Sequence, residues 1–179
     1  MYNIQVNEIT KQTEWEMLRE LSTSEDAFNF CVFEDESYFN SGIVKNTKKS
    51  GNFGIFLDSN LIGYSQFGID SQDVAWFSLY IAPKFRGNKF GEKTIHLVNA
   101  LLFDQFNVNS IRHTTFISNS KMIKLLKKTG AVEVGIFRFG GKYFTKDIKN
   151  KESSKVCLIL EYSVAEYNLN HCCPVRSVV

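Results

Sequence analysis

The segment from Trp76 to Gly91 combines residue types that can bind an anion. A run of apolar and aromatic residues ends at Pro83, and a turn with arginine, glycine and asparagine follows. A segment with helical spacing of its apolar residues then begins at Gly91. The unpaired N–H groups in the first turn of a helix point to one place, where the helix dipole also favours negative charge. The sequence therefore predicts a strand, a turn and a helix that bind a phosphorylated ligand.

The turn differs from the common nucleotide-binding loops, because neither G-x-x-x-x-G-K-[ST] nor G-x-G-x-x-G occurs there. It resembles the pyrophosphate-binding loop of the GNAT acyltransferases, [Q/R]-x-x-G-x-[G/A]. Arg86 and Gly91 fit this pattern, and Lys89 stands at the usual position of the middle glycine. The resemblance implies phosphate contacts from Arg86, Gly87, Asn88, Lys89, Phe90, Gly91 and Glu92.

Two expectations concern the backbone of this loop. At Lys89 we expect a helical φ, which brings the ammonium group near the phosphates without strain. At Gly91 we expect that an added β-carbon would occupy the place of the phosphate. Gly91→Glu is therefore predicted to abolish acetyl-CoA binding and to leave the fold intact.

A second segment, residues 119–131, is similar to the family pattern N-x-x-[SA]-x-x-L-[Y]-x-K-x-G-[FA]. Asn119, Leu125, Lys128 and Gly130 match it in register. Residues 132–138 then resemble the E-G-x-x-R stretch of the branch that acetylates ribosomal-protein N-termini. The resemblance covers about residues 50–162, and it implies that Asn119 contacts the pantetheine arm and that Lys128 belongs to the cofactor-binding set.

The same resemblance implies how the rest of acetyl-CoA binds. The pantetheine amides would pair with the strand end Leu79-Tyr80-Ile81, where it diverges from the strand that starts near Ile111. An N–H group there could also polarise the thioester carbonyl. We expect direct attack by a free amine without an acyl-enzyme, since no cysteine stands at the loop, and we expect no metal.

Acyl transfer to an amine needs a base for the ammonium and an acid for the thiolate. The family often has a glutamate in the central strand and a tyrosine after the helix leucine, and these positions hold Trp76 and Leu126 here. His113 lies on an alternating strand, which favours a core or surface role over that of a base. The candidate bases are Asp73, Glu34, Asp35, Glu36 or a water held by Ser78, and the candidate acids are Tyr80 and Tyr143.

The chain has 179 residues and a net charge of +2, from 21 basic and 19 acidic residues. This length fits one domain, which we place at residues 1–165 with a C-terminal tail at 166–179. The charge balance does not favour nucleic acid as a partner. No apolar run approaches the roughly 20 residues of a membrane span, and the cysteines indicate a reduced, cytoplasmic protein. A homodimer is left open.

The periodicities predict one α/β (α+β) domain in the order β-α-α-β-β-β-α-β-α-β-β. Its sheet is mixed, mostly antiparallel and twisted, with about six to seven strands and about four flanking helices. It splays at the strands near Leu79 and Ile111. The expected helices are Trp15 to Leu21, Ala27 to Phe33, Gly91 to Phe106 and a segment from Asn119 to Gly130.

We therefore expect an acetyl-CoA-dependent N-acetyltransferase. The amine could belong to a protein N-terminus, an amino-sugar, a polyamine or a modified nucleobase, and residues 24–46 and 139–155 would set this specificity. The alternative is a CoA-binding or protein-interaction module that lacks catalysis, because the usual glutamate and tyrosine are absent.

Overall fold

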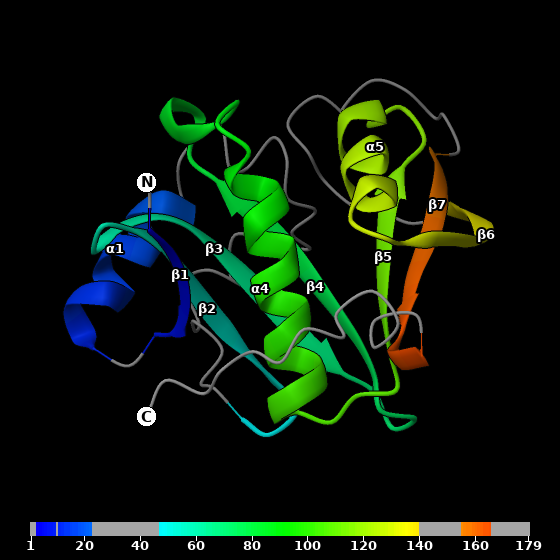
Figure 1. The fold of residues 1–179 in the computed structure, drawn as a ribbon, viewed down its shortest axis with the longest axis horizontal. Helices are drawn as coiled ribbons and strands as arrows, with labels where there is room; N and C mark the ends of the chain where they lie inside the picture. Colours follow the sequence, from blue (N-terminus) through cyan, green and yellow to red (C-terminus); the bar gives the residue numbers. More distant parts are fainter. Residues whose placement is uncertain (1–2, 10, 23–46, 140–154, 166–179) are drawn as a thin grey trace.

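A seven-stranded sheet in the order β1-β2-β3-β4-β5-β7-β6 forms the centre of the computed structural model. The structure describes residues 3–9, 11–22, 47–139 and 155–165 (Figure 1). The strands are β1 (Ile4–Glu8), β2 (Ser50–Leu57), β3 (Asn60–Ile69), β4 (Val74–Ile81), β5 (Ser110–Phe116), β6 (Val132–Phe139) and β7 (Lys155–Ser163). The helices are α1 (Gln12–Ser22), the short 3-10 helix η1 (Pro83–Phe85), α4 (Phe90–Gln105) and α5 (Ser120–Lys128).

The local sequence explains the hairpin of β2 and β3. Asp58 and Ser59 form its two-residue turn, and both have a positive φ, of 47° and 69°. Such turns twist in the same sense as the strands they join, and they favour small polar residues. The turn residues therefore account for the hairpin.

The two faces of the sheet carry different helices, which follows from the alternation of side chains along β4. Ala75 and Phe77 pack with α4 in the main core, whereas Tyr80 packs with Leu18 of α1 in a second cluster. Figure 1 shows α4 and α5 side by side over one face. The structure confirms the predicted α/β domain, and the predicted helix at Ala27 to Phe33 lies outside the described residues.

The sheet opens between β4 and β5, its only parallel pair among the described strands. Three residue pairs join them, Val74 to Ser110, Ala75 to Ile111 and Trp76 to Arg112. Beyond Trp76 the two strands diverge, so that β4 continues for five residues with β3 as its only described neighbour. The predicted splay is confirmed, and it exposes one edge of β4 beside the N-terminus of α4 (Figure 1).

Candidate functional site

The open edge of β4 presents a short row of backbone donors and acceptors. The Asp70 N–H binds the Val74 carbonyl at 3.0 Å, and the Ala82 N–H binds the Ile62 carbonyl at 2.9 Å. In an antiparallel ladder the peptide groups alternate in direction. The even-numbered residues of β4 therefore point to β3, and Phe77, Leu79 and Ile81 point to the opening.

The Arg86 side chain binds one of these backbone groups, the Ile81 carbonyl. Its Nε donates to the Ile81 carbonyl at 2.7 Å, and its guanidinium lies 5.4 Å from the centre of the Tyr80 ring. The side chain that the sequence assigned to the phosphates thus also closes the turn against the end of β4. The Leu79 N–H and carbonyl and the Ile81 N–H remain without a strand partner among the described residues.

The turn between β4 and α4 uses two left-handed residues. Gly87 has φ of 83°, and Lys89 has φ of 61° and ψ of 12°. The expected helical φ at Lys89 is wrong, because the chain must reverse immediately before α4 begins at Phe90. The family's usual glycine fits this position better on steric grounds, and the lysine side chain is exposed.

Among the described residues, no side chain caps the N-terminus of α4. Lys89 makes no side-chain cap, and the bond from the Lys93 N–H to the Lys89 carbonyl, at 3.3 Å, is the first of the helix. The N–H groups of Gly91 and Glu92 precede it. These two N–H groups therefore have no acceptor carbonyl within the helix. The dipole of α4 also favours an anion at this end.

Gly91 lies where α4 approaches α5 and the end of β4. A β-carbon there would lie 3.2 Å from Leu125 Cδ2 and 3.9 Å from Ile81 Cδ1. This β-carbon would thus face the contact between α4 and α5, and Leu125 would have to shift to admit a larger side chain. That the β-carbon would occupy the place of a phosphate, and that Gly91→Glu leaves the fold intact, stay predictions.

Glu92 and Lys128 form an ion pair between the two helices. Lys128 Nζ lies 2.6 Å from Glu92 Oε2, which joins the last turn of α5 to the first turn of α4. The hydrogen bond from Lys128 holds the pKa of Glu92 below its usual value. The structure thus brings together Glu92 and Lys128, two residues of the predicted binding set. The Glu92 carboxylate places a negative charge beside N–H groups that favour an anion.

Asn119 begins α5, as its sequence suggested. Its side-chain oxygen accepts a hydrogen bond from the Met122 N–H at 3.2 Å, which satisfies one of the free N–H groups of the helix. The side-chain amide nitrogen stays on the exposed surface of the turn. Asn119 can therefore cap α5 and still offer a donor to a ligand.

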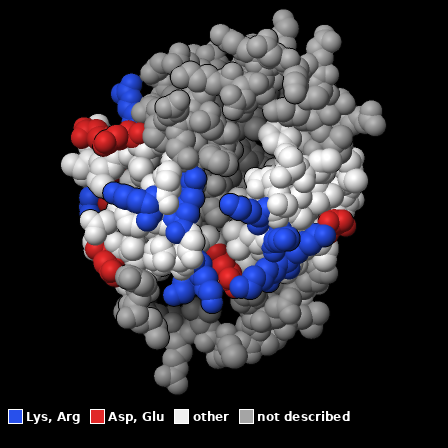
Figure 2. Space-filling model, turned by 90° about the horizontal axis from the view of Figure 1, so that it is seen from above, with Lys and Arg blue, Asp and Glu red and all other residues white. Residues whose placement is uncertain are grey.

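Basic side chains gather around this end of the molecule. Figure 2 looks down on it and shows Lys and Arg on both sides of a central depression, with an acidic group between them. The exposed basic residues of η1, the turn and the first turns of α4 and α5 are Lys84, Arg86, Lys89, Lys93, Lys121 and Lys124. We call this set the basic rim.

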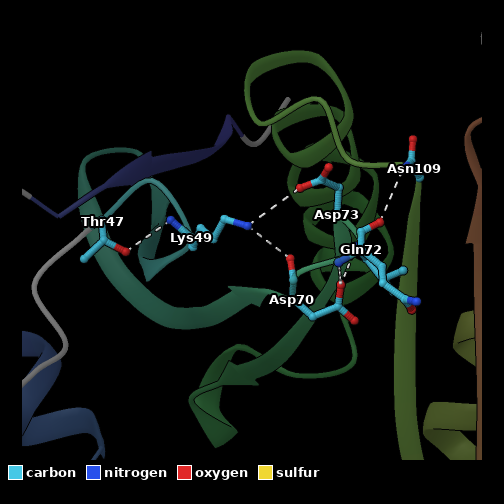
Figure 3. Close-up of polar contacts among 7 residues, drawn as sticks. Thr47, Lys49, Asp70, Gln72, Asp73 and Asn109 are labelled. Atoms are coloured by element: carbon cyan, nitrogen blue, oxygen red, sulfur yellow. Dashed lines mark hydrogen bonds and ion pairs between the residues drawn. The ribbon is translucent and has the colours of Figure 1, made fainter.

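Asp73, the expected base at the start of β4, lies far from the loop. It belongs to the β3–β4 turn, where Lys49 Nζ is 3.9 Å from its carboxylate (Figure 3). The strand between Val74 and Ile81 alone spans roughly 23 Å at about 3.3 Å per residue. The structure does not bring Asp73 together with the other site residues.

Ser78 and Tyr80 point to the face opposite α4. Ser78 is half-buried at the centre of β4, whereas Tyr80 is buried beside Tyr64, with ring centres 5.4 Å apart. Tyr80 therefore fits a core residue better than an acid. Glu34, Asp35, Glu36 and Tyr143 lie outside the described residues.

His113 is a site residue that the sequence reasoning did not select. It is 8% exposed, follows the last residue of β5 that pairs with β4, and makes a hydrogen bond to the Phe77 backbone. Burial lowers the pKa of His113 from 6.5 to about 3, so the ring is neutral. Its place in an alternating strand indicated the core, but not that the strands separate beside it.

A helix N-terminus without a side-chain cap, beside an open strand edge, suits an extended ligand with phosphates at one end. Residues 14–131 match the Acetyltransferase (GNAT) family, and the chain belongs to this family. The family confirms the expectation of an N-acetyltransferase that uses acetyl-CoA. The resemblance to the ribosomal-protein branch stays a prediction.

Solved structures of similar fold come from Vibrio cholerae. Its spermidine N-acetyltransferase in complex with CoA and spermine is 18% identical, with a TM-score of 0.72 over 92% of this chain and 97% of that one. A dodecameric structure of the same enzyme in an intermediate state has a TM-score of 0.69 at 18% identity, over 94% and 98% of the two chains. At this identity the likeness shows the fold. No curated protein matches the sequence significantly.

None of the helices among the described residues is both long and apolar enough to cross a membrane. No group of three or more His, Cys, Asp or Glu side chains within the same ranges could hold a metal ion.

Proposed function

We propose that this chain transfers the acetyl group of acetyl-CoA to a primary amine by direct attack of the amine on the thioester. The observation that carries the proposal is the open N-terminus of α4 beside the unpaired edge of β4. The N–H groups of Gly91 and Glu92 suit a pyrophosphate, and the edge groups of Leu79 and Ile81 suit the amides of pantetheine. The GNAT family match supports both assignments.

The loop would contribute shape as well as charge. Gly87 and Lys89 turn the backbone with their left-handed φ, and Asn88 donates to the Arg86 carbonyl at 3.3 Å. Phe90 packs its ring into the core and so anchors the first turn of α4. In this proposal Arg86 acts mainly by holding Ile81, and Lys89 supplies the charge nearest to the phosphates.

The chemical step would occur where β4 and β5 diverge. A backbone N–H of the open edge would polarise the thioester carbonyl, as donors do in an oxyanion hole. Asp73 is not retained as the base, because it lies at the other end of β4. A water beside Ser78 remains the candidate within the described residues, on the face that an amine could approach.

For the amine, we infer that a polyamine is the first acceptor to test. The similar fold of a spermidine N-acetyltransferase bound to CoA and spermine supports this choice. Protein N-termini, amino-sugars and modified nucleobases stay in the test panel. The sequence segments expected to select among them, 24–46 and 139–155, fall mostly outside the described residues.

Thermal unfolding with acetyl-CoA tests the cosubstrate. Ligand at about 100 times its dissociation constant should stabilise the protein by about 2.7 kcal/mol. Dephosphorylated fragments of CoA that lack the pyrophosphate should stabilise it much less at equal concentration. An absence of any shift with intact acetyl-CoA would disprove the proposal.

Turnover tests the alternative of a module without catalysis. Trp76 and Leu126 favour this alternative, since they replace the family's usual glutamate and tyrosine, and Leu126 is a fully buried core residue. Release of free thiol should be measured with spermidine, spermine, glucosamine and peptides with free N-termini. Binding of acetyl-CoA without thiol release across the whole panel would favour the binding module.

A further inference from the structure

The opening between β4 and β5 has a specific structural cause at its base. Phe77 is the first residue after the last paired position, and its carbonyl points toward β5. In a longer parallel ladder, a backbone N–H of β5 would bind this carbonyl. The hydrogen bond to the Phe77 backbone comes instead from the side chain of His113.

The chemistry of the ring assigns the two nitrogens. His113 Nε2 is buried and has no partner among the described residues, so Nδ1 makes the bond to Phe77. A carbonyl only accepts, and Nδ1 must therefore carry the proton. Nε2 is left as a bare acceptor in the core.

Two aromatic contacts fix the orientation of this imidazole. The His113 and Phe77 ring centres are 4.2 Å apart at 83°, and the Tyr162 ring centre is 5.7 Å away, also at 83°. Tyr162 is itself held through its hydroxyl by Thr129, the residue that caps the C-terminus of α5, at 2.5 Å. The imidazole is thus wedged between β4 and β7 at the point where β4 and β5 separate.

An apolar side chain would fill this space at lower cost, because the unpaired Nε2 loses its hydration on folding. It would, however, leave the Phe77 carbonyl without a donor. The strands could satisfy that carbonyl by extending their ladder. This extension would pair the edge groups of Leu79 and Ile81, the groups that the proposed function assigns to pantetheine.

We propose that His113 is a positioning residue for acetyl-CoA: its imidazole ends the β4–β5 ladder at Phe77 and keeps the adjoining edge of β4 open. The inference rests on the proposed function for the identity of the ligand. The role in strand separation stands on the contacts of His113 alone.

Three substitutions test this role. Asn places an amide N–H near the position of Nδ1, Gln places it one carbon further, and Leu removes the donor at similar volume. We expect His113→Asn to bind acetyl-CoA within threefold of the wild type. We expect His113→Gln and His113→Leu to raise the dissociation constant at least tenfold, with kcat at saturating acetyl-CoA within threefold.

Amide hydrogen exchange measures directly, without a ligand, whether the edge amides of β4 are hydrogen-bonded to β5. In the wild type the amides of Leu79 and Ile81 should exchange much faster than those of Tyr80 and Ala82, which face β3. His113→Leu should slow the first pair by at least tenfold. Slow exchange of Leu79 and Ile81 in the wild type would overturn the proposal even if the Leu variant does not fold.

Calorimetric titration separates this inference from the proposed function. If all three variants lower the melting temperature but bind acetyl-CoA as the wild type does, His113 is only a core residue and the inference is wrong. If the wild type itself does not bind acetyl-CoA, the proposed function fails, and the exchange of Leu79 and Ile81 still decides whether His113 keeps the strands apart.

Discussion

Lys89 combines a strained backbone with a useful charge. Its φ of 61° is a conformation that L-residues disfavour, and the position directly precedes the open turn of α4. An exposed ammonium there lies next to N–H groups that attract anions. Lys89 therefore lowers the stability of the fold through its backbone conformation, while its ammonium group attracts a phosphate.

Substitution at Lys89 should separate these two effects. Lys89→Gly removes strain and charge, whereas Lys89→Ala removes only the charge. We expect the Gly variant to be more stable than the Ala variant by about 0.5–1 kcal/mol, by urea denaturation. Both should bind acetyl-CoA more weakly than the wild type and equally so. Equal stability of the two variants would show that the left-handed turn is not strained in solution.

His113 should make the fold sensitive to acid. Its pKa is lowered to about 3 in the folded chain and is 6.5 when unfolded, so the unfolded state binds one more proton between these values. Stability should therefore fall as pH drops from 6.5 toward 3, by about 1.4 kcal/mol per pH unit from this group. Tyr162, the titratable group against the ring, has its pKa raised to about 12 by burial and is neutral throughout.

Urea denaturation at several pH values measures this dependence. His113→Asn should remove most of the slope between pH 6 and 4. His96→Gln is the matched control, because His96 lies on α4 and is not fully buried. It should change the slope less than His113→Asn does. A wild-type stability that is flat over this interval would mean that the imidazole is hydrated or that the core opens before it titrates.

At the scale of elements, the Glu92–Lys128 pair connects α4 and α5 and balances charge at the binding site. Lys128→Gln should leave the Glu92 carboxylate uncompensated beside the open N–H groups of α4. We expect this variant to bind acetyl-CoA several-fold more weakly. Glu92→Gln with Lys128→Gln should restore most of the affinity, because the repulsion is gone.

The outcome of this double substitution can be read by calorimetry at low salt. The same pair contributes little to stability, as exposed ion pairs do. The melting temperatures of Lys128→Gln and of the double variant should therefore stay close to that of the wild type. If the double variant binds as weakly as Lys128→Gln, Lys128 contacts the phosphate itself instead of neutralising Glu92.

The elements were largely predictable, because each follows from local patterns. A run of apolar and aromatic residues marked β4, and Asn119 marked the start of α5. The backbone of the loop was less predictable. The φ of Lys89 depends on how the chain leaves η1 and enters α4, and lysine itself gives no indication of a left-handed turn.

At the scale of the whole molecule, motif spacing predicted where the phosphate site lies but not how its members contact one another. Gly91 fitted the family pattern, yet only the packing of α4 on α5 reveals that its missing side chain makes room for Leu125. The bond from Arg86 to Ile81 and the bond from His113 to Phe77 depend on strand divergence. Asp73 looked close in sequence, but an extended strand carries it to the opposite end.

Charge is also distributed unevenly over the whole molecule. The net charge is only +2, yet the basic rim concentrates exposed lysine and arginine around one depression (Figure 2). Such a local field attracts a polyanionic ligand over a distance set by the Debye length. That length falls from about 30 Å at 0.01 M salt to about 8 Å at 0.15 M.

Association of acetyl-CoA should therefore depend on salt through the basic rim. We expect the association rate, measured by stopped-flow, to fall about tenfold or more between these two salt concentrations. Lys84→Gln combined with Lys121→Gln should reduce both the rate at low salt and its salt dependence. Lys48→Gln, which removes an exposed charge on the turn before β2, should change neither. If Lys48→Gln lowers the rate per charge as much as the rim substitutions do, attraction comes from net charge alone and the rim has no directing role.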